Sequence, residues 1–116
     1  MTVEEVYLNI CGDYQGVIGR LISEDRVKRF VLKFLNDTSF NTLIDAIEKE
    51  DAEEAFRAAH TLKGICQNLG FTKLQESSSE LCELLRGGTL TKDRLLLEKV
   101  IEDYNETVEA IRKLDE

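Results

Sequence analysis

Apolar residues recur at the spacing of an α-helix along almost the whole chain, and no segment alternates apolar and polar residues as a β-strand would. The 116 residues include no proline, the residue that most strongly breaks helices. The spacing predicts a helix over residues 3–10, interrupted at Gly12, and a short second helix from Tyr14 to Leu21. Ser23 is a plausible N-cap for a third helix. That helix is expected to turn four side chains inward: Val27, Phe30, Val31 and Phe34.

The rest of the chain predicts four longer amphipathic helices joined by loops of about 2–6 residues. Asp51 and Gly70 are placed to cap the second of these helices at its two ends. Thr72 starts the third helix, and Thr91 opens the last. Such lengths and loops suit antiparallel neighbours. We therefore predict an all-α protein, an antiparallel four-helix bundle with short additional N-terminal helices, in which residues 1–116 form a single domain.

The composition argues against several classes of function. A net charge of −8 disfavours a nucleic-acid partner, because phosphate backbones require clustered lysine and arginine. No apolar run reaches the roughly 18–20 residues that cross a bilayer. The first residues are acidic, unlike the basic start of a signal peptide. A cytoplasmic, monomeric protein that binds neither nucleic acid nor membrane is expected.

Three cysteines and one histidine form no recognisable metal site, because no CxxC pair is present. Cys66 falls in an apolar stripe and is expected to be a buried, reduced thiol, whereas Cys82 is expected to be partly exposed. The sequence also lacks a P-loop or any other glycine-rich nucleotide loop. We therefore expect no bound metal, no cofactor and no kinase activity.

The only histidine, His60, lies in the middle of the second long helix. At 100° per residue it falls roughly 130° from the centre of that helix's apolar stripe, on the solvent side. Gly64 follows at i+4, where a larger side chain would cover the ring. A mid-helix glycine costs about 0.8–1 kcal/mol relative to alanine, so its position indicates a need for open space. Arg57 and Lys63 place cations one turn to either side, and Gln67 lies nearly in line two turns on.

The surroundings of His60 are positive on an otherwise acidic chain, because no acidic residue occurs between Ala55 and Gln75. An exposed imidazole with an open approach and nearby cations suits a phosphoryl group, which brings about −1.5 to −2 charges and three acceptor oxygens. Neutral imidazole is also a competent nucleophile near pH 7. A solvent-facing histidine with no role is the simpler interpretation, but it does not account for the glycine and the flanking cations.

The segment Ala-His-x-Leu-Lys-Gly-x5-Gly at residues 59–70 resembles the signature of histidine-containing phosphotransfer (HPt) domains, the helical relays of phosphorelay signalling. The length, the helical pattern and the central place of the motif extend this resemblance over most of the chain. The resemblance implies that His60 carries the phosphoryl group, that Lys63 steadies it and that Gly64 clears space. It also implies two kinds of partner, response-regulator receiver domains and a hybrid sensor histidine kinase, with Mg²⁺ bound by the receiver.

The sequence departs from this family at one position. Family members often carry a glutamine about 22 residues after the histidine, on the next helix, where it orients the imidazole ring, and here that position is Cys82. Gln67, Ser78 and Ser79 are the alternatives for this hydrogen bond, and the sequence does not choose among them.

Two classes of function follow from these observations. In the first, the protein is a phosphorelay intermediate: His60 accepts a phosphoryl group from a receiver aspartate and passes it to another receiver. Such transfer needs positioning and charge neutralisation more than acid–base chemistry. In the second, the protein is a helical adaptor that binds a partner through the same face without covalent chemistry. Labelling by a phosphorylated receiver distinguishes the two.

Overall fold

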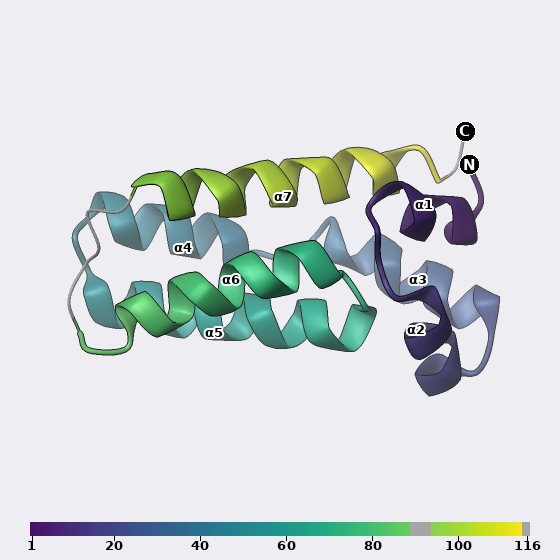
Figure 1. The fold of residues 1–116 in the computed structure, drawn as a ribbon, viewed down its shortest axis with the longest axis horizontal. Coiled ribbons are helices and arrows are strands. Elements are labelled where there is room, and N and C mark those ends of the chain that lie inside the picture. The colour runs from purple at the N-terminus through teal and green to yellow at the C-terminus, as the bar shows by residue number, and fades with distance from the viewer. Residues whose placement is uncertain (89–93, 115–116) are drawn as a thin grey trace.

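The computed structural model describes residues 1–88 and 94–114, and within these ranges the chain is α-helical with no β-strand. In Figure 1 the helices from residue 39 onward run along a bundle, and the helices before them gather at the end where the N-terminus lies. The predicted all-α class with additional N-terminal helices is confirmed. The proposed start at Thr91 lies outside the described residues. The helices are α1 (Val3–Asn9), α2 (Tyr14–Leu21), α3 (Glu24–Phe34), α4 (Ser39–Glu48), α5 (Ala52–Leu69), α6 (Thr72–Leu85) and α7 (Arg94–Arg112).

One apolar core holds the bundle together, and every helix contributes to it. α5 packs against both α4 and α6, and α6 packs against α7. Phe40 of α4 and Tyr104 of α7 close the bundle, because their rings stack with centroids 3.8 Å apart. Burying an aliphatic or aromatic side chain stabilises a fold by about 1.5–3 kcal/mol. The largest fully buried side chains include Tyr7, Leu43, Leu62, Phe71, Leu74, Leu81, Leu85 and Ile111.

The N-terminal helices hold the C-terminal end of α5, the helix that carries the histidine. The last carbonyl groups of a helix have no hydrogen-bond partner inside it. The Tyr7 hydroxyl donates to the carbonyl oxygen of Leu69. The Arg20 guanidinium donates to the carbonyl oxygens of Asn68, at 2.9 Å, and Gln67, at 3.2 Å. A cation here also offsets the negative end of the helix dipole. α1 and α2 therefore cap α5.

The predicted caps at Ser23, Asp51 and Gly70 are confirmed, at the start of α3 and at the two ends of α5. Gly70 follows α5 in the left-handed conformation, with φ of 72°. A Cβ atom at this position would lie 2.7 Å from the carbonyl oxygen of Asp13, so the close approach of the α1–α2 loop also requires glycine. The side chains of Ser23 and Asp51 each accept a backbone N–H from the first turn of the helix that they precede.

Two expectations about burial are wrong. Phe30, expected to point inward, has an exposed fraction of 43%. The buried stripe of α3 is Val27, Val31 and Phe34, and Phe30 lies at the edge of that stripe, where solvent reaches it. Cys82, expected to be partly exposed, is fully buried, because it belongs to the face of α6 that enters the core.

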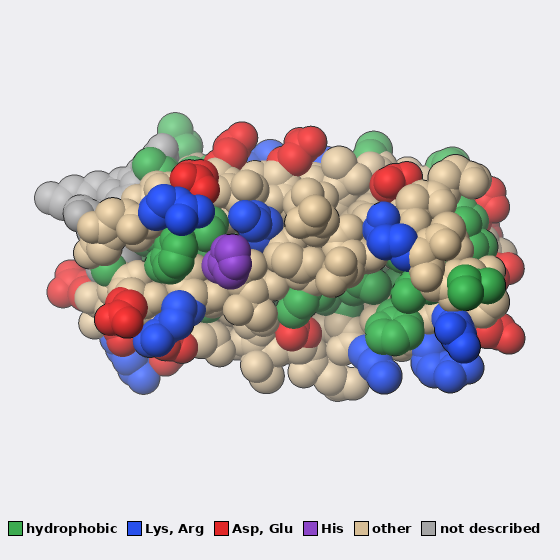
Figure 2. Space-filling model, turned by 90° about the horizontal axis from the view of Figure 1, so that it is seen from below, with side chains coloured by type: hydrophobic (Ala, Val, Ile, Leu, Met, Phe, Trp, Pro, Cys, Tyr) green, Lys and Arg blue, Asp and Glu red, His purple; other side chains and the backbone are tan. Residues whose placement is uncertain are grey.

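α5 presents the histidine on the outside of the bundle. In Figure 2 the single purple side chain lies at the surface, with basic and hydrophobic side chains beside it. Toward the other end of the same face, over the N-terminal helices, further hydrophobic and basic side chains gather. The face that displays the histidine therefore extends from the bundle of α4 to α7 onto the N-terminal helices.

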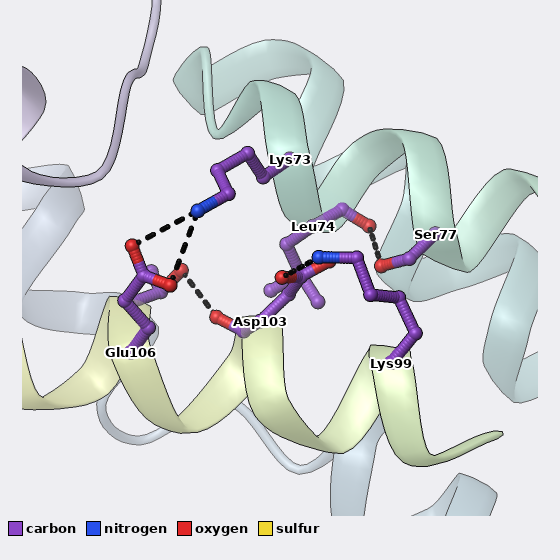
Figure 3. Close-up of polar contacts among 7 residues, drawn as sticks. Lys73, Leu74, Ser77, Lys99, Asp103 and Glu106 are labelled. Carbon is purple, nitrogen blue, oxygen red and sulfur yellow. Dashed lines mark hydrogen bonds and ion pairs between the residues drawn. The ribbon is translucent and has the colours of Figure 1, made fainter. Parts of the chain in front are cut away.

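A polar seam joins α6 to α7 (Figure 3). Asp103 has an exposed fraction of 2%, and its Oδ1 accepts a hydrogen bond from the Lys99 ammonium at 2.8 Å. Lys73 of α6 donates to both carboxylate oxygens of Glu106 of α7, each at 3.2 Å. The Thr107 hydroxyl donates to the Asp103 carbonyl oxygen. A buried charge requires a partner, and Lys99 supplies one for Asp103 from within α7. Lys73 links α6 to the same helix through Glu106.

Candidate functional site

His60 is exposed on the outer face of α5, while its neighbours Ala59 and Leu62 are buried. Side chains on a helix lean toward its N-terminus, so the imidazole lies over the preceding turn. There it stacks on Phe56, with 6.1 Å between the ring centroids and 21° between the ring planes. This geometry is that of an offset aromatic stack. Within residues 1–88 and 94–114 the imidazole forms no hydrogen bond, so its nitrogens are available to a partner.

Gly64 leaves the other side of the ring uncovered. A Cβ atom built at Gly64 would meet no heavy atom within 4 Å outside its own helix backbone. Helix packing therefore does not require glycine at this position. A larger side chain there would project beside His60, one turn away on the same helix. The space at Gly64 is thus available to a molecule that approaches the imidazole.

Lys63 lies close to the last turns of α6. The hydrogen bond and charge of Arg86 hold the pKa of Glu83 below its usual range, and the charge of Lys63 lowers it further. Burial raises the pKa of the Cys82 thiol, and the charge of Lys63 opposes that rise. In the part of the chain that the structure describes, Lys63 forms no ion pair. Its positive charge is therefore available one turn from His60.

Arg57 and Gln67, the other predicted site residues, are both exposed on α5. The Arg57 guanidinium contacts the carboxylates of Glu53 at 3.6 Å and Glu54 at 3.1 Å. Exposed pairs of this kind stabilise little, but they direct the guanidinium toward the first turns of α5. The backbone carbonyl of Gln67 accepts from an arginine of α2, and its side chain remains at the surface.

None of the three alternatives for the ring-orienting hydrogen bond reaches His60 among the described residues. Ser78 is fully buried, and its hydroxyl has no hydrogen-bond partner there. Ser79 is half-buried, and Gln67 is exposed. The contact that the structure gives the imidazole is the Phe56 ring. The His60 ring is therefore oriented by stacking on Phe56 and not by a hydrogen bond from any of these three side chains.

Two neighbours of the site do not follow from the sequence analysis. The apolar pattern assigns Phe56 to the buried stripe, although its place one turn before His60 is a signal that a contact between the rings was possible. Arg86 lies 26 residues after His60 in the sequence, and no such signal predicts its contact with the site. In the structure its guanidinium is 5.4 Å from the centroid of the Phe56 ring, a cation–π contact between α5 and the end of α6.

The site offers an exposed nucleophilic imidazole, an open approach and nearby positive charge. In the described residues no three side chains of histidine, cysteine, aspartate or glutamate gather to form a metal site. None of the described helices is long and apolar enough to span a membrane. The arrangement suits the reversible attachment of an anionic group to His60, because cations stabilise the charge that such a group brings.

Comparison with known proteins identifies the family. The family model described as the Hpt domain matches residues 35–113, which is more than half of the chain and contains α4 to α7. No curated protein and no solved structure matches the sequence. The matched range includes the exposed histidine and the bundle around it. This chain therefore belongs to the Hpt domain family, whose members carry phosphoryl groups in two-component signalling.

Proposed function

We propose that this protein is a phosphorelay intermediate and that His60 is its phosphoryl-accepting residue. The observation that carries the proposal is the geometry at His60: the only histidine of the chain is exposed beside the unfilled space at Gly64. Family membership supports the class of chemistry. The nearby charge of Lys63 supports the identity of the transferred group, because a phosphoryl group is strongly anionic.

In the proposed step, a neutral imidazole nitrogen of His60 attacks the phosphorus of an aspartyl phosphate on a receiver domain. An N–P bond forms while the P–O bond to the aspartate breaks, and the carboxylate leaves with its electron pair. The other ring nitrogen keeps its proton. Attack by the aspartate of a second receiver reverses these changes and regenerates the imidazole. Lys63 neutralises part of the charge on the phosphoryl group, and Mg²⁺ held by the receiver would supply further charge neutralisation.

The remaining assignments follow from this step. Gly64 admits the receiver, and Gln67 and Arg57 contact the phosphoryl group or the docked receiver. The partners are receiver domains and a hybrid sensor histidine kinase, so the phosphoryl group comes from a partner rather than from ATP. We propose a monomeric, cytoplasmic carrier rather than an enzyme, which binds no metal or cofactor of its own and neither nucleic acid nor membrane.

An apolar groove extends the proposed docking face onto the N-terminal helices. It has a volume of about 400 Å³ and is lined by side chains of α2, α3 and α5, among them Leu21, Phe30 and Ile65. Arg20 and Lys33 add positive charge to its wall, which one carboxylate, that of Asp37, offsets in part. Apolar contacts flanked by cations complement a receiver, whose phosphorylation site is acidic. We therefore propose that residues 1–116 act as a single domain, with the receiver covering both the groove and the imidazole.

Replacing Phe30 with alanine is expected to weaken receiver binding by roughly fivefold or more, because aromatic side chains at an interface contribute strongly to affinity. Stability should change little, since the ring is 43% exposed. The dissociation constant from calorimetric titration with the receiver measures the effect. Leu8→Ala is the matched control, because Leu8 is also an exposed hydrophobic residue but does not line the groove. Equal dissociation constants for wild type and Phe30→Ala would exclude the groove from the interface.

Replacing Lys63 with alanine is expected to slow phosphoryl transfer, or to shorten the lifetime of phosphorylated His60, by roughly tenfold, because a charge-assisted contact to the phosphoryl group is lost. The helical circular dichroism and the melting temperature should stay close to wild type. Rapid-quench transfer from a phosphorylated receiver gives the rate, and decay of the isolated phosphoprotein gives the lifetime. If both quantities were unchanged, Lys63 would be an ordinary surface lysine.

One labelling experiment tests the proposed function against the adaptor alternative. Incubation with a receiver phosphorylated on its aspartate should place about one phosphoryl group on each molecule, and the label should be acid-labile and alkali-stable, as phosphohistidine is. An adaptor that uses the same face would bind the receiver without acquiring label. Binding without label would therefore reject the relay and favour the adaptor.

A further inference from the structure

The Phe56 ring connects the proposed site on α5 to the end of α6. One neighbour of the ring is the His60 imidazole, stacked with 6.1 Å between centroids. The other is the Arg86 guanidinium, whose Cζ atom lies 5.4 Å from the same centroid. Arg86 is the C-cap residue of α6, and its side chain extends from the end of α6 to the Phe56 ring on α5. A single aromatic ring thus places a guanidinium on the same part of the surface as the imidazole.

A carboxylate holds this guanidinium at the same time. Arg86 makes two hydrogen bonds to Glu83, at 2.8 Å and 3.1 Å, in the bidentate geometry that arginine forms with carboxylates. Both side chains are more than half exposed. An exposed ion pair contributes little to stability, so a stronger anion can displace the carboxylate. A phosphoryl group brings more charge and three acceptor oxygens, and arginine also binds it bidentately.

The charges around the ring favour Arg86 over Arg57 as a second cation. Arg57 contacts two carboxylates, Glu53 and Glu54, at the beginning of α5. Arg86 contacts one, and Lys63 also acts on that carboxylate, because its charge lowers the pKa of Glu83 beyond the effect of Arg86 itself. Two cations, Arg86 and Lys63, therefore act on one carboxylate, which leaves positive charge for an incoming anion.

We propose that Arg86 is a second phosphoryl ligand, and that it stays paired with Glu83 while His60 is unmodified. When His60 is phosphorylated, the guanidinium exchanges the Glu83 carboxylate for the phosphoryl oxygens, and Phe56 keeps it within reach throughout. Only ion pairs are exchanged in this step, and no covalent bond changes. The inference rests on the proposed function of His60. It adds that the exchange of ion pairs at Arg86 sets the lifetime of the phosphorylated form.

The test compares the decay of phosphorylated protein in three variants. Arg86→Ala should shorten the lifetime of the phosphohistidine, because a ligand is lost. Glu83→Gln should lengthen it by roughly two- to fivefold, because the competing carboxylate is removed. The double variant should decay like Arg86→Ala, since Glu83 acts only through Arg86. In wild type, the Arg86 Nε–H resonance in ¹H–¹⁵N spectra should shift when His60 becomes phosphorylated.

Asp45→Asn and Lys49→Ala are the matched controls. Asp45 and Lys49 also form an ion pair that is more than half exposed, at 2.9 Å and at the C-terminal end of a helix, and the proposed site does not include it. Both controls should decay like wild type. Wild-type lifetimes in all three test variants, with an unmoved Arg86 resonance, would overturn this inference while leaving the relay intact. A lengthened lifetime in the double variant would overturn it as well. A wild-type protein that accepts no label at all would overturn the proposed function and this inference together.

Discussion

Replacing His60 with glutamine is expected to abolish phosphoryl acceptance completely while leaving the fold intact. Glutamine retains a polar side chain of similar reach, but its amide nitrogen is not nucleophilic. The imidazole is exposed, and its described ring contact is with Phe56, so little packing is lost. Substitutions at such surface positions usually change stability by less than about 0.5 kcal/mol. Labelling by a phosphorylated receiver, followed by gel autoradiography, measures acceptance, and thermal melting followed by circular dichroism measures the fold.

The interpretation depends on both measurements together. An unlabelled variant that melts like wild type assigns the phosphoryl group to His60. An unlabelled variant that has unfolded would require the label to be mapped in wild type instead, by mass spectrometry of the phosphorylated peptide that spans α5. A His60→Gln protein that still accepts a full equivalent of label would show that another residue carries the group.

Replacing Gly64 with leucine is expected to block transfer nearly completely and at the same time to stabilise the protein. The added side chain meets no neighbouring atom within 4 Å at its Cβ position, and leucine favours a helix over glycine by roughly 0.8 kcal/mol. A gain of this size raises the melting temperature of a small domain by several degrees. The same side chain occupies the space beside His60 through which a receiver must approach. Stability and transfer should therefore change in opposite directions.

Gly19→Leu is the matched control for this substitution. Gly19 lies within α2, and a Cβ atom there would also meet no atom within 4 Å. The control should gain comparable stability and keep transferring the phosphoryl group. A marked fall in the melting temperature of Gly64→Leu would mean that the glycine serves helix packing. A stabilised Gly64→Leu protein with wild-type transfer would mean that the open space has no part in docking.

The local pattern of the sequence predicts the fold well, because each helix carries its own signals. Ser23 and Asp51 mark helix starts through hydrogen bonds to the residues that follow them, and Gly70 marks a helix end through its left-handed backbone conformation. The outward placement of His60 follows from the same periodicity. Phe30 shows where the pattern fails: apolar spacing indicates a stripe, but how far a partner helix covers its edge depends on packing between α2, α3 and α5.

The parts of the site that lie on one helix can be predicted, and those that depend on two cannot. His60, Lys63 and Gly64 share a face of α5 because of their spacing alone. The approach of Arg86 to Phe56 depends on the register between α5 and α6, which the interior packing of both helices determines. The burial of Cys82 has the same origin. The sequence motif thus predicts which residue is the nucleophile, whereas the contact of Arg86 with Phe56 is apparent only in the structure.

The central claim is that phosphoryl groups pass between receivers through His60, and a relay between two receivers tests it most directly. One receiver is phosphorylated on its aspartate with radiolabel and freed of donor, and a second, unlabelled receiver is added with or without this protein. The account predicts that label reaches the second receiver only when the protein is present, through a transient acid-labile phosphoprotein, and that His60→Gln stops the passage. Passage of label with His60→Gln at the wild-type rate, or no passage with wild type through any pair of receivers that bind it, would contradict the account.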